Sequence, residues 1–202
     1  MLRQGGKRTL TLERVDGSQP QAIGKSIDVV GTSDWSPDGR WVVVGGAEGN
    51  KGLFKIPVDG GEPVQVTTGA AYDPVWSPAG DLIVYAGANL AGRAPLLAVQ
   101  SDGTPVELPS VHTVASSISG RLRFLPDGSG VVFVKGKAGV LVREFWLLDL
   151  AARKTRQLAD LTWTTSQGEI LNFDITPDGN HIVFDRSVDN SDIVLIDLPQ
   201  RR

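Results

Sequence analysis

A five-residue motif occurs four times in this chain and constrains its fold more than any other feature. Its fullest form is Trp-Ser-Pro-Asp-Gly at residues 35–39, and its variants occupy residues 76–80, 124–128 and 175–179. Aligned on the proline, successive copies are 41, 48 and 51 residues apart. Repeats of this length are typical of propeller blades, solenoid turns or arrays, so the sequence predicts a repeat protein.

The chemistry of each copy predicts a tight turn between two strands. Proline presets φ at the second position of a type I turn, and glycine supplies the positive φ that lets the chain reverse. The residues five to seven positions after each proline are apolar, as in Val42–Val44 and Val131–Phe133. A strand that is apolar on both faces has to be covered on both sides, which happens when sheets stack.

Further strand-like segments follow the hairpin in every repeat, two in each of the first three and one in the last. The sequence therefore predicts an all-β fold, a β-propeller of about four four-stranded antiparallel blades preceded by an N-terminal strand pair. The predicted boundaries are 1–8 for a disordered segment, 9–199 for the propeller, 9–28 for its partial blade, and about 29–68, 69–109, 118–159 and 168–199 for the four blades.

Four blades are the low end for a closed ring. The fourth repeat lacks an outermost strand, and residues 10–15 or 21–24 could fill that place and close the ring. The other edge of the N-terminal pair would then stay unpaired, which favours an open arc, a partial propeller. An open arc exposes apolar blade faces at its ends, so self-association through those faces is predicted.

Composition excludes several classes of function. The net charge is -3 and the two signs are interspersed, so no basic surface for nucleic acid is expected. The chain has no cysteine, and its two histidines lie in different repeats, so no thiolate nucleophile, metal or cofactor is predicted. No apolar run is long enough for a membrane span, and no signal peptide is expected. The residues themselves do not indicate a compartment.

The repeated motif resembles the repeat of TolB-type propellers, relatives of WD-repeat proteins in which Trp-Ser-Pro-Asp-Gly marks the first hairpin of each blade. Residues 72–78 are an especially close match, and the resemblance extends over residues 9–199. The sequence departs from the pattern at Ala79, which replaces Asp, and at Leu125 and Thr176, which replace Ser. These changes are conservative for a turn.

Residues 185–199 are similar to the carboxyl end of bacterial Ser/Thr kinases that carry such a propeller, and winged-helix regulators are another possible parent. The resemblance implies a non-catalytic protein- or ligand-binding module, the sensory or scaffolding part of a bacterial signalling or envelope system. The alternative is a fragment of a propeller-containing enzyme, a Ser/Thr kinase or prolyl-oligopeptidase-like peptidase, whose catalytic domain is absent here. As part of a longer protein, the propeller would be periplasmic or extracytoplasmic.

The chain itself is expected not to be an enzyme, because it has no kinase motif and no Gly-x-Ser-x-Gly element. Binding on such a scaffold is expected in the loops that lead from one blade to the next. The side chains there with the reach to contact a protein or peptide partner are Tyr72, Asp73, His112, Arg121 and Trp163.

Two other sequence features have structural interpretations. The position two residues before each turn proline holds Trp35, Trp76, Phe124 and Ile175, and it is predicted to pack between blades rather than to form a stacking surface. Lys135-Gly136-Lys137 is predicted to be a hairpin tip, because three residues alone do not make a phosphate site.

Overall fold

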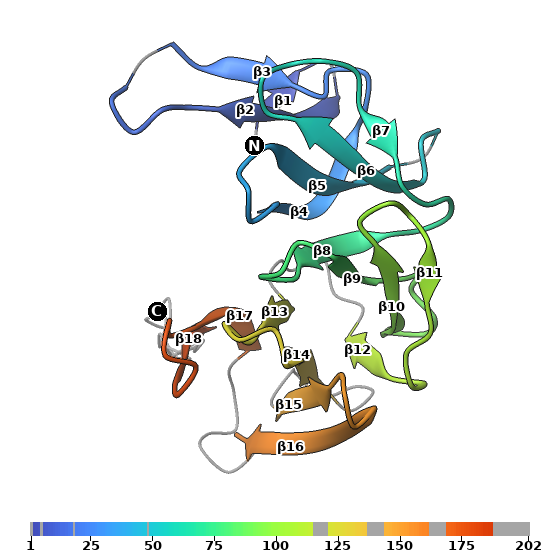
Figure 1. Cartoon of the computed structure of the whole chain (residues 1–202), viewed down its shortest axis with the longest axis vertical. Helices are drawn as coiled ribbons and strands as arrows, with labels where there is room; N and C mark the ends of the chain where they lie inside the picture. The colour runs from blue at the N-terminus through green and yellow to red at the C-terminus, as the bar shows by residue number, and fades with distance from the viewer. Residues whose placement is uncertain are drawn as a thin grey trace, which may run out of the picture.

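A computed structural model describes residues 2–4, 6–17, 19–47, 49–114, 121–136, 144–161 and 169–187. Within these ranges the chain is all-β and contains no helix, so no described helix could cross a membrane. The strands form antiparallel sheets that follow one another around an arc (Figure 1). This arrangement confirms the predicted stack of propeller blades.

Three sheets have the four-stranded order of a blade. Blade 1 contains β4 (Val29–Trp35), β5 (Trp41–Gly46), β6 (Gly52–Pro57) and β7 (Val64–Gln65). Blade 2 contains β8 (Tyr72–Trp76), β9 (Leu82–Ala86), β10 (Arg93–Gln100) and β11 (Pro105–Val106), with β12 (His112–Val114) also paired to β10. Blade 3 contains β13 (Leu122–Phe124), β14 (Gly130–Lys135), β15 (Glu144–Asp149) and β16 (Lys154–Asp160).

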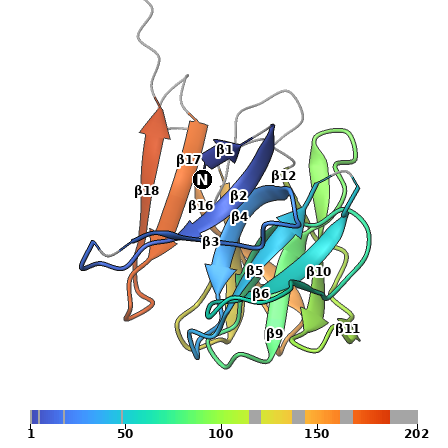
Figure 2. The same cartoon turned by 90° about the horizontal axis from the view of Figure 1, so that it is seen from above.

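The two ends of the arc are less complete. Blade 4 is described as the pair β17 (Glu169–Ile175) and β18 (Ile182–Ser187), and its expected third strand lies outside the described residues. The N-terminal sheet contains β1 (Leu2–Gln4), β2 (Lys7–Leu12) and β3 (Gln21–Ile23). In the view from above (Figure 2), the orange β17–β18 pair and the green β10 and β11 lie on opposite sides of the arc. The described sheets do not close into a ring.

Two strands lie where the sequence predicts none. Residues 1–8, expected to be disordered, include β1 and the start of β2, because backbone pairing of Leu2 with Thr9 needs no apolar side-chain pattern. Residues 112–114, expected to belong to a long loop, pair with the first half of β10, since that strand is eight residues long and β11 covers only its second half.

The four turns adopt the predicted equivalent conformation. In each, the glycine N–H donates to the carbonyl three residues earlier at 2.8–2.9 Å, and the glycine φ lies between 69° and 79°. Ser36 Oγ donates to Asp38 and accepts from the Trp41 N–H. Where Ala79 replaces the turn aspartate, Ser77 Oγ donates to Asp81 instead, at 2.6 Å.

The apolar core lies between blades. Residues five and seven positions after the turn proline face the preceding blade, and the residue between them faces the following blade. In blade 1, for example, Val42 and Val44 pack toward the N-terminal sheet, whereas Val43 packs against blade 2. Each interior blade is therefore buried on both faces, which explains the uninterrupted apolar runs.

The position two residues before the turn proline follows the same rule. Trp76, Phe124 and Ile175 contribute to the clusters between blades 1 and 2, 2 and 3, and 3 and 4, as predicted. Trp35 is 51% exposed, and it does not belong to the apolar cluster between the N-terminal sheet and blade 1.

Candidate functional site

The residues five positions before the turn prolines join three blades along the inner side of the arc. They are Thr32 on β4, Asp73 on β8 and Arg121 just before β13, and Figure 1 shows these strands nearest the centre. The Thr32 N–H and hydroxyl both donate to Asp73 Oδ1, at 2.9 and 3.2 Å. Arg121 Nη2 lies 3.0 Å from Asp73 Oδ2, and Arg121 Nη1 donates to the Val114 carbonyl at 2.7 Å. These residues form the inner cluster.

The inner cluster is removed from solvent. Asp73 is 1% exposed and Arg121 is 8% exposed. Burial lowers the pKa of Arg121, and the negative charge of Asp73 opposes that shift. Asp73 Oδ2 accepts no hydrogen bond of ordinary geometry from a described residue, so its attraction to Arg121 is chiefly Coulombic. A buried ion pair of this kind favours the packing of blades 2 and 3 that brings the two charges together, because either charge alone would be buried without compensation.

Backbone geometry supports the inner cluster. Asp73 has φ of 47°, a left-handed conformation that aspartate tolerates better than most residues. Gly31 has φ of 71°, and a Cβ at this position would lie 2.7 Å from Asp73 Oδ1. A side chain at position 31 would therefore displace the carboxylate from the Thr32 donors.

A second set of charges lies two residues further along the inner strands. Asp34 Oδ2 accepts a hydrogen bond from the Trp76 N–H at 2.7 Å, which links blade 1 to blade 2. Burial raises the pKa of Asp34, while the hydrogen bonds from Trp76 and Trp35 and the charge of Arg123 oppose the increase. Arg123 forms an ion pair with Asp174 at 3.4 Å, which links blade 3 to blade 4.

The structure brings together two of the five side chains predicted to contact a partner. Asp73 and Arg121 pair with each other, and Tyr72 is the half-buried first residue of β8 beside them. His112 lies away from this cluster, in β12, and Trp163 lies outside the described residues. Contact with a partner stays a prediction for these residues, but the charged groups of Asp73 and Arg121 already join blades.

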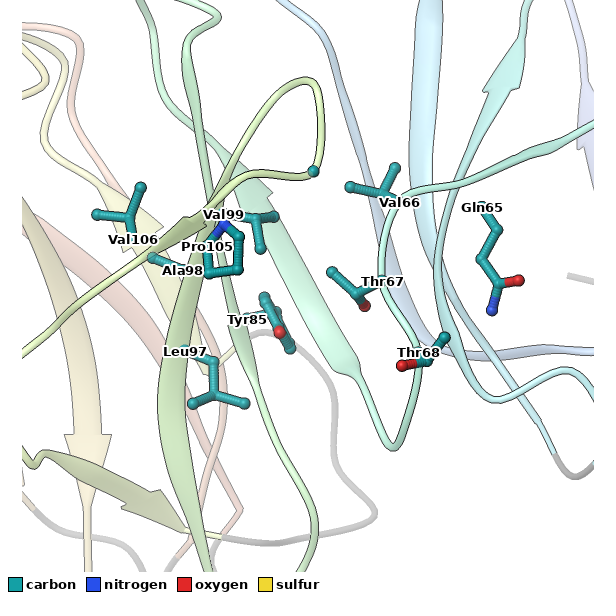
Figure 3. A pocket seen from close by; sticks show the side chains of 11 residues that line it. Gln65, Val66, Thr67, Thr68, Tyr85, Leu97, Ala98, Val99, Pro105 and Val106 are labelled. Atoms are coloured by element: carbon teal, nitrogen blue, oxygen red, sulfur yellow. The ribbon is translucent and has the colours of Figure 1, made fainter.

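The sequence does not indicate a groove of about 590 Å³ between blades 1 and 2. In Figure 3, Gln65–Thr68 form one wall, and Tyr85, Leu97–Val99 and Pro105 form the other. None of the described residues that line the groove carries a charge. Burial raises the pKa of Tyr85, and a hydrogen bond with Thr67 opposes this shift. The walls are suited to neutral, partly apolar groups. Apart from Tyr85, which belongs to the apolar run of the second repeat, their residues come from segments that carry no sequence motif.

The described residues contain no group of three His, Asp or Glu side chains placed to hold a metal ion. Two ion pairs lie on or beside the inner strands instead, Asp73 with Arg121 and Asp174 with Arg123. The inner cluster therefore has the chemistry of a structural junction between blades.

Comparison with solved structures shows a TolB-like propeller fold. The chain is similar to TolB from Acinetobacter baumannii, with a TM-score of 0.62 and 17% identity over 87% of this chain and 42% of that protein. It is also similar to a putative TolB from Agrobacterium tumefaciens, with a TM-score of 0.61 and 19% identity over 87% of this chain and 60% of that one.

An oligogalacturonate lyase in complex with manganese aligns with 91% of this chain and 54% of its own, with a TM-score of 0.61 and 16% identity. The chain thus spans about half the length of these structures. The resemblance predicted from the repeated motif is confirmed at the level of the fold. No protein-family model matches the sequence, and no curated protein matches it.

Proposed function

We propose that this chain is a non-catalytic interaction module that binds a protein partner through the open faces of its terminal blades. The observation that carries the proposal is the exposure of residues whose equivalents are buried elsewhere. Trp35 is 51% exposed, whereas Trp76 at the same repeat position is 7% exposed. Val183 is 63% exposed, whereas Val43, its equivalent in blade 1, is fully buried.

The two open faces carry the same kinds of residue that pack against each other inside the arc. We call the face of a blade that points toward the preceding blade its leading face, and the face toward the following blade its trailing face. Trp76 at the leading face of blade 2 packs in the same cluster as Val43 at the trailing face of blade 1. The open leading face carries Trp35, and the open trailing face carries Val183. A second copy of the chain could therefore bind head to tail, with its Val183 face against Trp35. Such contacts are heterologous, so two arcs would form a ring if the rotation closes.

Sedimentation velocity of the purified 202-residue chain at micromolar concentration tests this proposal. We expect a concentration-dependent dimer, which Trp35→Ser and Val183→Asp each weaken. Val64→Asp is the matched control, because Val64 is 47% exposed on β7, the outer edge strand of blade 1, three strands away from the inner strand β4 that carries Trp35. A monodisperse monomer, or equal weakening by the control, would overturn binding through the terminal faces.

The non-catalytic part of the proposal has a separate test. Its support is the pairing of the inner charged residues with one another and the absence of kinase and hydrolase motifs from the sequence. Turnover of an ester, peptide or ATP substrate, abolished by one point substitution, would favour an enzyme instead. A sensory or scaffolding role in a bacterial signalling or envelope system is the setting that we propose for this module.

A further inference from the structure

A cavity of about 310 Å³ lies where β12 of blade 2 meets β14 and β15 of blade 3. The Thr113 hydroxyl donates to the Val134 carbonyl at 2.8 Å and holds β12 against β14. In the ladder between β10 and β12, the register places Arg93 and His112 on the same face. Both of these residues line the cavity.

The other wall carries Lys135 and Glu144, which are opposite each other in the ladder of β14 and β15. Lys135 Nζ lies 3.6 Å from the ring centre of Trp146 and 5.4 Å from that of Phe133. Glu144 Oε2 accepts a hydrogen bond from Trp146 Nε1 at 2.8 Å. Among the described residues, no carboxylate lies within 4.0 Å of the Arg93 or Lys135 cationic groups.

The cavity therefore holds two cations and an imidazole against one carboxylate, and one oxygen of that carboxylate is already bonded. Burial lowers the pKa of Lys135, the Glu144 charge opposes this shift, and the Arg93 charge adds to it. Ser110 and Thr155 add hydroxyl groups to the lining. An anion that enters would pair with two cations that have no carboxylate within 4.0 Å among the described residues.

We propose that this cavity binds a small oxyanion, a carboxylate or phosphate group of a ligand, with Arg93 and Lys135 as its charged contacts and His112 as a third polar contact. The sequence predicts a hairpin tip at Lys135-Gly136-Lys137, of which Lys137 lies outside the described residues, and these three residues alone could not form such a site. The fold supplies the missing groups from β10 and β12. The site is distinct from the terminal blade faces, so it does not depend on the proposed function.

Amide chemical shifts of His112 and Thr113, followed by NMR in low-salt buffer, test the proposal. Inorganic phosphate and succinate are the two probes, and the one that binds more tightly identifies the preferred anion. We expect saturable shifts, with affinity about tenfold lower in Arg93→Gln and in Lys135→Gln, because a charge-assisted hydrogen bond contributes about 1.5 kcal/mol.

Lys55→Gln is the matched control. Lys55 also lies over an aromatic ring, 5.3 Å from the centre of Trp41, but its ammonium already donates to the Ser101 carbonyl at 2.6 Å. Its substitution should leave anion affinity unchanged. The proposal is overturned if neither probe gives a saturable shift, or if Arg93→Gln and Lys135→Gln, still folded by circular dichroism, bind as tightly as the control.

Discussion

Trp35 and Trp76 occupy the same position of two successive repeats, and their surroundings differ completely. Trp76 lies between blades 1 and 2 at 7% exposure, and its indole N–H donates to the Gly80 carbonyl at 3.0 Å. Trp35 is 51% exposed and lies outside the apolar cluster that joins the N-terminal sheet to blade 1. Burial at this position is therefore determined by the neighbouring blade and not by the repeat itself.

The other end of the arc shows the same effect. Val43, Val84 and Val132 are at most 1% exposed, and Val183 at the equivalent position is 63% exposed. One repeat position thus has a core environment in three blades and a surface environment in the fourth. Matched substitutions can separate the contribution of the repeat from that of the neighbouring blade.

The largest difference is expected between Val43→Asp and Val183→Asp. Aspartate at position 43 would place a charge between two blades that offer no partner, so this variant should not fold. Aspartate at position 183 should change the free energy of unfolding by about 0.5 kcal/mol or less. Circular dichroism melting of both variants measures the difference, and equal melting temperatures would show that the assignment of blade faces is wrong.

A large difference is also expected between the two tryptophans. Trp76→Ala should lower the free energy of unfolding by about 3–5 kcal/mol, because it leaves a cavity between blades and removes the bond to Gly80. Trp35→Ala should cost less than about 1 kcal/mol, since half of its surface is already exposed. Urea unfolding followed by far-UV circular dichroism, at a protein concentration at which the chain is monomeric, compares the two variants. Equal losses there would mean that Trp35 is as deeply buried as Trp76 within one chain.

The next largest loss of unfolding free energy is expected when the ion pair of the inner cluster is broken. Arg121→Met should cost about 3 kcal/mol, because it leaves the Asp73 carboxylate buried without its cation. Asp73→Asn alone should also lower the free energy of unfolding. Because Asn also tolerates the positive φ at this position, the loss reflects the missing charge and not backbone strain. The double variant should lose less than the sum of the two single losses. Strictly additive losses in a double-mutant cycle would exclude energetic coupling between blades 2 and 3 through this pair.

The turns could be predicted from the sequence because their interactions are local. The contacting groups of each turn lie within about six residues of sequence, so the motif and the residues directly after it are enough to predict the turn. The inner cluster could not be predicted in this way. Thr32, Asp73 and Arg121 share one repeat position but have unrelated side chains, and their contacts depend on how closely three inner strands approach.

The sequence also could not indicate which blade faces would be covered. Val183 belongs to an apolar run like those of the other blades, so its pattern predicts burial on both sides. The sequence could not predict the cavity beside His112 for a similar reason. Its cations come from β10 and β14, strands of two different blades, and its imidazole comes from β12, a strand that the sequence does not predict.

The smallest expected effect on stability comes from protonation of the turn aspartates, and it should not depend on the neighbouring blade. Hydrogen bonds from Thr176 and Asn180 lower the pKa of Asp178 to about 2, and similar local donors lower the pKa of Asp38 and Asp127. Because these pKa values are depressed in the folded state, their stabilisation is present above the unfolded value of 3.8 and is lost as pH falls toward 2.

An NMR titration of the side-chain carboxyl carbons measures these values in one experiment. We expect Asp178 of blade 4 to titrate near 2, and Asp38 of blade 1 and Asp127 of blade 3 also to titrate below 3.8, although Val183 of blade 4 is exposed. Thr176→Val removes the hydroxyl donor and should raise the pKa of Asp178 toward 3.8 while leaving that of Asp127 unchanged. If Asp178 alone titrates near 3.8 in the unsubstituted chain, turn geometry also requires a covering blade, and the distinction between local turns and blade-dependent packing fails.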